Sequence, residues 1–346
     1  MIVGDGTERN QLKLWALLAS SLIVLAFIGF ILWRLTDHDL DRRADERLHF
    51  VVDGYSISGT IWLPDKAPNA VVAFVYGDGA QDRTSSGGYA PMINAFLDKG
   101  IAVAAWDKPG VGQSKGNWLL QSMADRTAET RAALQVLKHR FEGIVIGAIG
   151  FSQAGWVLPA LTPEDADFLV LVGPAVSWQD QGDYYARTRL AMDGFDTETI
   201  NEMITAQNQE DERIFGKDAK ESDAPSNMSR DRWGFNQRNR TADARQALST
   251  LELPLLAIWG ADDLNVDAVR NAEIYLEALA RRNEATQIIV WPEATHGLLK
   301  ARSYNWQLTK DWSWFAIMRF LAEGRYAYSP GTINAIAIWV LGVTQD

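Results

Sequence analysis

The sequence predicts an α/β fold in which a mostly parallel sheet carries helices on both faces. Short apolar runs, each about the length of a buried strand, recur at 70–76, 101–106, 144–149, 168–172, 254–259 and 287–291. Stretches with helical patterns separate most of these runs, and this alternation is typical of βαβ units. The runs are apolar throughout rather than at every second residue, which indicates strands buried on both faces.

Other elements follow from local patterns. Residues 48–63 predict two short strands around an Asp53-Gly54 turn. Helices are expected at 89–99, at about 122–140, from near Gln153 onward, at 266–282 and at 308–323.

Two segments stand outside the α/β alternation. Residues from about 177 to 250 are polar, acid-rich and patterned as helices, which predicts a helical cap inserted over the top of the sheet. The apolar patch at 333–343 is too short to span a bilayer. We expect it to pack on the domain.

An uncharged apolar segment occupies residues 14–33, with Trp15 and Trp33 near its two ends. A helix of this length spans about 30 Å, which matches the hydrocarbon core of a bilayer. Tryptophan at both ends is typical of the membrane–water interface. A cleaved signal peptide would have an apolar region of about 7–15 residues before a small-residue cleavage site, and no such site follows Phe30. We therefore expect a single-pass transmembrane anchor.

The anchor predicts the organisation of the chain. The expected parts are an N-terminal tail at 1–13, the anchor at 14–33, a charge-mixed juxtamembrane spacer at 34–47, and one large domain at 48–346 that includes the cap. A count of Lys and Arg on the two sides would place the domain in the cytoplasm, but long domains cross membranes largely regardless of flanking charge. We favour a periplasmic or other extracytoplasmic domain.

Composition argues against several classes of function. The net charge of -11 disfavours nucleic acid, because affinity for its phosphate backbone comes mainly from Lys and Arg. The chain has no cysteine, which removes disulfides, thiolate metal sites and cysteine nucleophiles. Residues 106–114 contain a Gly-Val-Gly step, but they complete neither a dinucleotide-binding nor a P-loop pattern. We expect no cofactor and no metal, and the oligomeric state stays open.

The sharpest chemical feature is Gly150-Phe151-Ser152-Gln153-Ala154, between a predicted strand and a predicted helix. A sharp turn there pushes the serine hydroxyl out at the top of the sheet, and small flanking residues let strand and helix pass closely. The segment resembles the nucleophile elbow, G-x-S-x-G, of the α/β-hydrolase family, with Ala154 at the second glycine position. The resemblance implies that Ser152 is the nucleophile.

In that family the acid and then the histidine follow the serine along the chain. Of the four histidines, only His296 lies in a loop just after the last predicted strand, where the family has its catalytic base. The acid is expected after strand 254–259, where a G-x-x-D pattern maps to Asp263, with Asp262 and Asp267 as alternatives. Ser152, Asp263 and His296 are therefore the predicted catalytic triad.

The resemblance also implies an oxyanion hole of two backbone N–H groups. One donor is expected from Gln153, and the other from Asp78 in the loop after strand 70–76. This loop, 76–83, resembles the H-G-S-G-x-x-D-R loop of bacterial esterase- and peptidase-like members, with Tyr76 and Asp78 in place of the first His and Ser. The Asp78 carboxylate is unfavourable beside an oxyanion unless it points away. Residues 106–114 resemble the family's D-x-R-G-x-G-x-S loop, for which we expect a structural role.

These residues predict a membrane-anchored serine hydrolase that cleaves a small acyl ester through an acyl-enzyme. Aminopeptidase-like, thioesterase or acyltransferase activity on the same triad is the alternative among enzymes. A catalytically inactive binding protein with this fold is the alternative of another class, and the altered oxyanion loop is the feature in its favour. The expected partners are a small-molecule acyl substrate and, through 14–33, the membrane.

Overall fold

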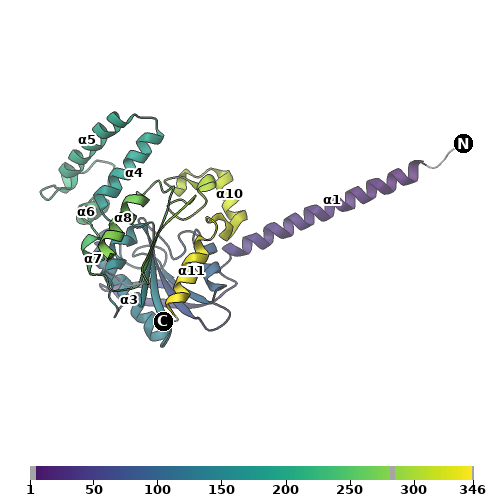
Figure 1. Ribbon diagram of the computed structural model, residues 1–346, viewed down its shortest axis with the longest axis horizontal. Coiled ribbons are helices and arrows are strands. Elements are labelled where there is room, and N and C mark those ends of the chain that lie inside the picture. Colours follow the sequence, from purple (N-terminus) through teal and green to yellow (C-terminus); the bar gives the residue numbers. More distant parts are fainter. Residues whose placement is uncertain (1–4, 281–284, 345–346) are drawn as a thin grey trace.

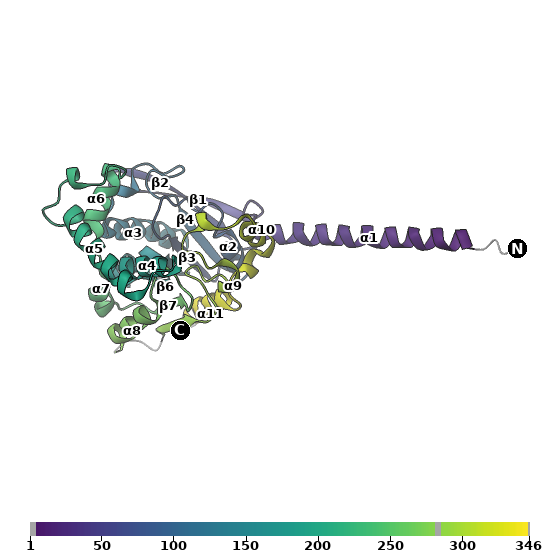
Figure 2. The same cartoon turned by 90° about the horizontal axis from the view of Figure 1, so that it is seen from above.

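A computed structural model describes residues 5–280 and 285–344. Figure 1 shows the long helix α1 (Asp5–Leu35) projecting from a layered domain whose central sheet lies between helices. The second view, Figure 2, shows α1 leaving one end of the domain while the cap helices lie at the opposite end. Nothing in the described part of the domain covers the apolar window of α1, which is long enough to span a membrane.

Within the described residues, eight strands form one sheet in the order β1-β2-β4-β3-β5-β6-β7-β8. The strands are β1 (Ala44–Val52), β2 (Tyr55–Leu63), β3 (Ala70–Val75), β4 (Ile101–Trp106), β5 (Val145–Phe151), β6 (Phe168–Val172), β7 (Leu255–Gly260) and β8 (Gln287–Trp291). Among these eight strands, only the pairs β1–β2 and β2–β4 are antiparallel. The mostly parallel sheet predicted from the apolar runs is thus confirmed.

The β1–β2 hairpin turns where the sequence predicts. Asp53 and Gly54 both have positive φ, 49° and 78°. A two-residue loop with both residues in this region matches the right-handed twist of the paired strands, and Asp-Gly is a favoured sequence for it.

Two hydrophobic cores form because helices cover both faces of the sheet. The covering helices are α3 (Met123–Arg140) and α8 (Ala268–Leu279) on one face, and α2 (Ala90–Leu97) and α11 (Thr332–Val343) on the other. In α11, Ile336 and Val340 are fully buried. The apolar patch at 333–343 therefore packs on the domain, as expected.

The cap lies between β6 and β7. It comprises α4 (Trp178–Met192), α5 (Thr197–Phe215), α6 (Arg230–Asn239) and α7 (Arg245–Thr250). Ser177, Asp196 and Ser229 begin the first three of these helices, and each side chain accepts a backbone N–H three residues on, which stabilises a helix start. Sequence patterns did not predict α6, which is polar on most of its surface.

The segment after Ser152 differs from the prediction. Instead of an α-helix from near Gln153, two short 3₁₀ helices follow, Ser152–Trp156 and Leu158–Ala160. Pro159 lacks a backbone N–H and disfavours an α-helix through this stretch. Near the C-terminus, α9 (Ala301–Tyr304) and α10 (Trp314–Glu323) flank a loop, so the helix expected at 308–323 begins later than predicted.

Residues 34–47, expected as a spacer, contact the domain closely. Arg34, Asp37 and Arg43 are buried, and β1 begins within the range, at Ala44. The Asn94 side-chain amide of α2 donates to the carbonyl oxygen of Asp37 at 2.9 Å.

Candidate active site

Ser152 lies at the end of β5 in a strained backbone conformation. Its φ is +51°, a region that L-residues other than Gly, Asn and Asp adopt rarely. A Cβ atom on Gly150 would lie 2.8 Å from the Cβ of Ala154 and 2.7 Å from Cδ1 of Leu158. Only glycine fits at 150, which is the close packing that a nucleophile elbow requires. The strain at Ser152 is what turns its side chain out of the sheet.

The loop after β3 runs directly beside this serine. Residues of β3 and β5 pair in parallel, with Val75 opposite Gly150. A Cβ atom on Gly77 would lie 3.1 Å from the Cβ of Ser152 and 3.7 Å from its Oγ. The backbone that was predicted to supply the second oxyanion donor is therefore adjacent to the predicted nucleophile.

His296 and Asp263 form the hydrogen bond expected of a base and its acid. His296 Nδ1 and Asp263 Oδ2 are 2.7 Å apart, and the Asp263 side chain is fully buried while that of His296 is 21% exposed. The other carboxylate oxygen, Oδ1, accepts the backbone N–H groups of Asn265 and Val266 at 2.7 and 2.9 Å. The carboxylate is thus held rigidly with one oxygen left for the imidazole.

The two alternative acids lie elsewhere. Asp262 is exposed to solvent. Asp267 caps α8, where its Oδ1 accepts the N–H of Arg270 at 3.0 Å. Of the three candidates, the structure brings only Asp263 to His296.

The register of β5 and β6 brings His296 and Ser152 to the same edge of the sheet. Phe151 pairs with Val172, so the next residues, Ser152 and Gly173, leave the sheet side by side. A Cβ atom on Gly173 would lie 2.9 Å from Nδ1 and from Cε1 of His296. The described hydrogen bonds of His296 include the one to Asp263 but none to Ser152 Oγ. Such nucleophile–base contacts are often long before substrate binds.

Burial and Asp263 act in opposite directions on His296. Burial alone would lower the pKa of His296, but the charge of Asp263 and its hydrogen bond together outweigh burial and raise that pKa above its ordinary value. The Asp263 carboxylate would stabilise the imidazolium that forms when His296 accepts a proton.

A buried lysine supports the loop beside Ser152. Lys108 Nζ donates to the carbonyl oxygen of Gly77 and, at 3.0 Å, to that of Gly79. Carbonyl and N–H groups of a trans peptide point in opposite directions. The bond to Gly77 therefore turns the Asp78 N–H away from Lys108. Burial, and next the charge of Arg126, lower the pKa of Lys108 well below its ordinary value.

Arg126 of α3 joins the two halves of the predicted oxyanion hole. Its guanidinium donates to the carbonyl oxygen of Tyr76 and, at 2.6 Å, to Oε1 of Gln153. Burial lowers the pKa of Arg126. Sequence reasoning missed both Lys108 and Arg126: the first lies in a loop assigned only a structural role, and the second is one of several charges on α3.

The carboxylate of Asp78 has partners of its own. Its Oδ1 accepts from Nε2 of Gln153 at 3.3 Å and lies 3.8 Å from a guanidinium nitrogen of Arg232, on cap helix α6. These contacts give the negative charge partners outside the backbone N–H pair. They also connect the oxyanion loop to the cap.

Tyr76, which stands where the resembled loop has a histidine, is buried. Its ring stacks on that of Tyr89, with centroids 5.1 Å apart, and its hydroxyl donates to the carbonyl oxygen of Arg83. Burial raises its pKa. The side chain of Tyr76 packs behind the loop that its backbone helps to form.

The loop at 106–114 has the expected structural contacts. The Asp107 carboxylate accepts from the side chain of Arg83 at 2.7 Å and from the N–H of Gln113 at 3.0 Å. Gly112, with φ +52°, is needed because a Cβ there would lie 2.4 Å from Asp107 Oδ2. The loop thus fixes the end of the oxyanion loop at Arg83. Among the described residues, no group of three or more His, Cys, Asp or Glu could hold a metal ion.

The sheet order and the serine on a sharp turn after β5 are those of a serine hydrolase of the α/β-hydrolase fold. The model of the serine aminopeptidase family S33 matches residues 66–302, more than half of the chain. The chain therefore belongs to the serine aminopeptidase S33 family.

Solved structures share the fold. They include a lipase in its open form (16% identity, 88% of this chain and 100% of that one, TM-score 0.55), an esterase of Pyrococcus furiosus (17%, 73% and 84%, 0.53) and a bacterial membrane phospholipase A (16%, 98% and 100%, 0.51). At these identities the likeness concerns the fold alone.

Proposed function

We propose that this protein is a membrane-anchored serine hydrolase that cleaves a small acyl ester through Ser152, His296 and Asp263. The observation that carries the proposal is the 2.7 Å contact between His296 and the buried Asp263, next to the turn that holds Ser152 at φ +51°. An inactive binding protein has no need of a strained serine beside a polarised histidine.

The proposed reaction is acyl transfer to water. Ser152 Oγ attacks the carbonyl carbon while His296 Nε2 takes its proton. The N–H groups of Gln153 and Asp78 hold the negative charge that forms on the carbonyl oxygen. The alcohol then leaves with the proton from His296. A water molecule, deprotonated by His296, next attacks the acyl-enzyme and releases the acid and free Ser152.

The cap would form one wall of the substrate site. The Tyr184 hydroxyl on α4 donates to the carbonyl oxygen of Asp263 at 2.8 Å, and Gln307 Nε2 donates to the carbonyl oxygen of Tyr185 at 2.9 Å. The cap therefore contacts both the loop that carries Asp263 and the segment before α10. A movement of α4 would therefore shift the position of Asp263.

Aminopeptidase-like activity is the second candidate, because the matching family model is that of serine aminopeptidases. The same attack and the same oxyanion hole serve an amide, with His296 donating its proton to the leaving amine. Turnover of matched pairs of acyl ester, thioester and aminoacyl amide substrates distinguishes these activities.

Covalent labelling with a fluorophosphonate probe tests the nucleophile. We expect the full-length protein in detergent to be labelled, and labelling to vanish in Ser152→Ala. Ser222→Ala, which changes an exposed serine of the cap, should label like wild type. Labelling that persists in Ser152→Ala, or no labelling of folded wild-type protein, would contradict the proposal.

We further propose that α1 spans the membrane and that the domain lies on its extracytoplasmic side. The support is the length and apolar composition of α1 and the exposure of its apolar window.

A further inference from the structure

Helix α10 exposes an apolar surface that the catalytic site does not use. Trp314, Phe315, Ile317 and Met318, here called the α10 surface, are 65%, 77%, 44% and 45% exposed. Ala316 is the buried residue of the same turn. Apart from α1, no described helix exposes four large apolar side chains within five residues. Contiguous patches of this kind mark interaction sites.

The C-terminal half of α10 contacts the end of α1. Arg34 Nε donates to the carbonyl oxygen of Ala322 at 3.1 Å, and the ring of His38 lies edge-on to that of Phe320, 5.2 Å between centroids. Figures 1 and 2 both show α10 at the end of the domain from which α1 leaves. The α10 surface is therefore near the place where a bilayer around α1 would end.

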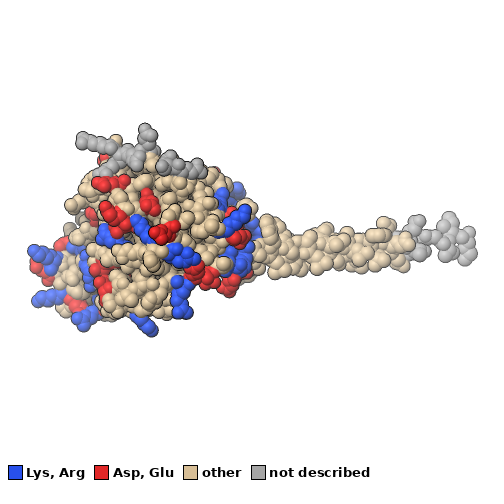
Figure 3. All heavy atoms as spheres, turned by 90° about the horizontal axis from the view of Figure 1, so that it is seen from below, with Lys and Arg blue, Asp and Glu red and all other residues tan. Residues whose placement is uncertain are grey.

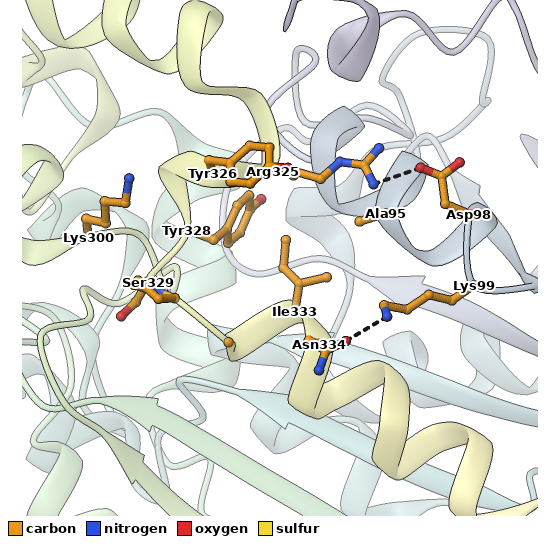
Figure 4. A pocket seen from close by; sticks show the side chains of 12 residues that line it. Ala95, Asp98, Lys99, Lys300, Arg325, Tyr326, Tyr328, Ser329, Ile333 and Asn334 are labelled. Carbon is orange, nitrogen blue, oxygen red and sulfur yellow. Dashed lines mark hydrogen bonds and ion pairs between the residues drawn. The ribbon is translucent and has the colours of Figure 1, made fainter.

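An ion-pair cluster fixes α1 relative to α10. Arg325, two residues past α10, pairs with Asp37 just after α1 at 2.7 Å and with Asp98 just after α2 at 2.7 Å. Figure 4 shows the Arg325–Asp98 pair at the edge of a pocket of about 410 Å³. Two lysines of this pocket, Lys99 and Lys300, bind Asn334 and Glu323. Because each of these cations has a partner, we interpret the cluster as a structural contact that holds α1 against α10, not as an anion-binding site.

Residues around the junction are of the types found at membrane–water interfaces. The Arg34 guanidinium lies 4.1 Å from the centroid of the exposed Tyr326 ring and 5.7 Å from that of Trp33. Figure 3 shows Lys and Arg side chains, with acidic ones among them, around the end of the domain next to α1. Tryptophan, tyrosine and arginine favour this zone because they have an apolar body and a polar end.

We propose that the α10 surface is a second membrane contact, in which Trp314, Phe315 and Met318 enter the interfacial region of the bilayer that α1 spans. The proposal rests on the proposed anchoring by α1. An amphipathic helix with aromatic residues on one face binds a lipid surface in this way. The two contacts together would hold the domain at one tilt to the membrane.

This contact would link the bilayer surface to the catalytic site through the segment between α9 and α10. Between α9 and α10, Gln307 Nε2 donates to the carbonyl oxygen of Leu264 at 2.9 Å, and its own carbonyl oxygen accepts from Nδ2 of Asn265 at 3.0 Å. These neighbours of Asp263 tie the acid loop to the segment that leads into α10.

Single fluorescent labels test the proposal, because the chain has no cysteine. Phe315→Cys, Leu25→Cys and Val269→Cys each carry an environment-sensitive dye on the full-length protein in phosphatidylcholine vesicles. Leu25 lies within the proposed anchor, and Val269 is an exposed apolar residue of α8, away from α1. We expect blue-shifted emission, and loss of intensity with brominated lipids, at positions 315 and 25 but not at 269.

Each other outcome overturns the proposal in a distinguishable way. Quenching at 25 without quenching at 315 would leave the anchor and remove the α10 contact. No quenching at 25 would remove the anchor and the contact with it. A blue shift at 315 without quenching by lipid would assign the surface to a second copy of the chain. Quenching at 269 equal to that at 315 would indicate adsorption of the whole domain.

Discussion

Asp263 is the residue on which the ionisation of His296 depends. In the proposed mechanism neutral His296 is the base, so activity should be lost as the pH falls through the pKa of His296. Because Asp263 raises that pKa above the ordinary 6.5, the loss begins at a higher pH than for an unperturbed histidine. Burial opposes Asp263, so removing the carboxylate leaves burial as the dominant influence.

We expect Asp263→Asn to lower kcat by up to about 10⁴-fold, as in other serine hydrolases, because the imidazole is then held in the wrong tautomer. The pKa of His296 should fall, and the acid limb of the kcat/KM profile should therefore shift to lower pH. The pH–rate profile and an NMR titration of the imidazole measure both effects. Asp262→Asn is the matched control, since Asp262 is exposed. An unchanged acid limb in Asp263→Asn would refute the assignment.

In the proposed reaction Lys108 is a positioning residue, because it contacts the oxyanion loop and not the reacting atoms. We expect Lys108→Met to lower kcat by up to about 10²–10³-fold, the range for losing one oxyanion donor, with a smaller change in KM. Steady-state kinetics on a soluble ester substrate measure the split. Lys115→Met, which changes an exposed lysine just after this loop, should behave like wild type.

If Lys108 only stabilised the fold, Lys108→Met would lower stability without lowering kcat. Loss of its two hydrogen bonds to carbonyl groups should also lower stability, by about 1–3 kcal/mol for each group left unsatisfied. If folded Lys108→Met kept wild-type kcat, the oxyanion loop would not depend on this lysine.

At the scale of elements, the packing of β5 against β6 determines where Ser152 lies. In the middle of β5, a Cβ atom on Gly147 would come within 2.3 Å of the ring of Phe168, which is fully buried in β6. Phe168 in turn contacts Trp339 of α11, with centroids 5.9 Å apart. A side chain at position 147 would therefore displace Phe168 and, through it, Trp339 of the C-terminal helix.

Gly147→Ala should destabilise the domain by about 1–3 kcal/mol, the usual cost of overpacking a core. Denaturant unfolding measures the change in the free energy of unfolding. Gly234→Ala in α6 is the matched control, because the nearest atom to its added Cβ is 3.8 Å away. That variant should be neutral or up to about 1 kcal/mol more stable, since alanine favours helices. A neutral Gly147→Ala would show that Phe168 can move.

At the scale of the whole molecule, α1 and the cap lie at opposite ends of the domain (Figure 2). Residues 34–43 do not separate α1 from the domain, because Arg34, Asp37 and Arg43 are buried there. In the proposed topology, α10, the catalytic site and the cap therefore all lie on the same side of the membrane.

A membrane-impermeant maleimide tests that side in spheroplasts. We expect Val269→Cys on the domain to be labelled in intact spheroplasts, and Gln11→Cys, before the apolar window of α1, to be labelled only after lysis. The reverse pattern would place the domain in the cytoplasm. Labelling of both positions without lysis would argue against a spanning α1.

Much of the fold could be predicted from the sequence because its strands are local features. The ranges 101–106 and 168–172 coincide with β4 and β6, since a buried parallel strand is an uninterrupted apolar run. The range 287–291 coincides with β8, but this strand is at the edge of the sheet and is not buried on both faces as its apolar run predicts. The nucleophile elbow was recognisable because its geometry depends on neighbouring residues, Gly150 and Ala154. The resemblance to the α/β-hydrolase family, with its chain order and strand-end positions, was enough to propose Asp263 and His296, which the structure places in contact.

The rest depended on contacts between residues far apart in the chain. Lys108 and Arg126 are conventional surface-type residues in the sequence, and only tertiary packing buries them under the loop at Gly77. The pairing of Arg325 with Asp37 joins residues 288 positions apart. The sequence by itself determined the sheet, the apolar helix and the serine at the strand end, because each is encoded by near neighbours. Only the tertiary structure decided which charges are buried and what α10 faces, because burial depends on the whole fold.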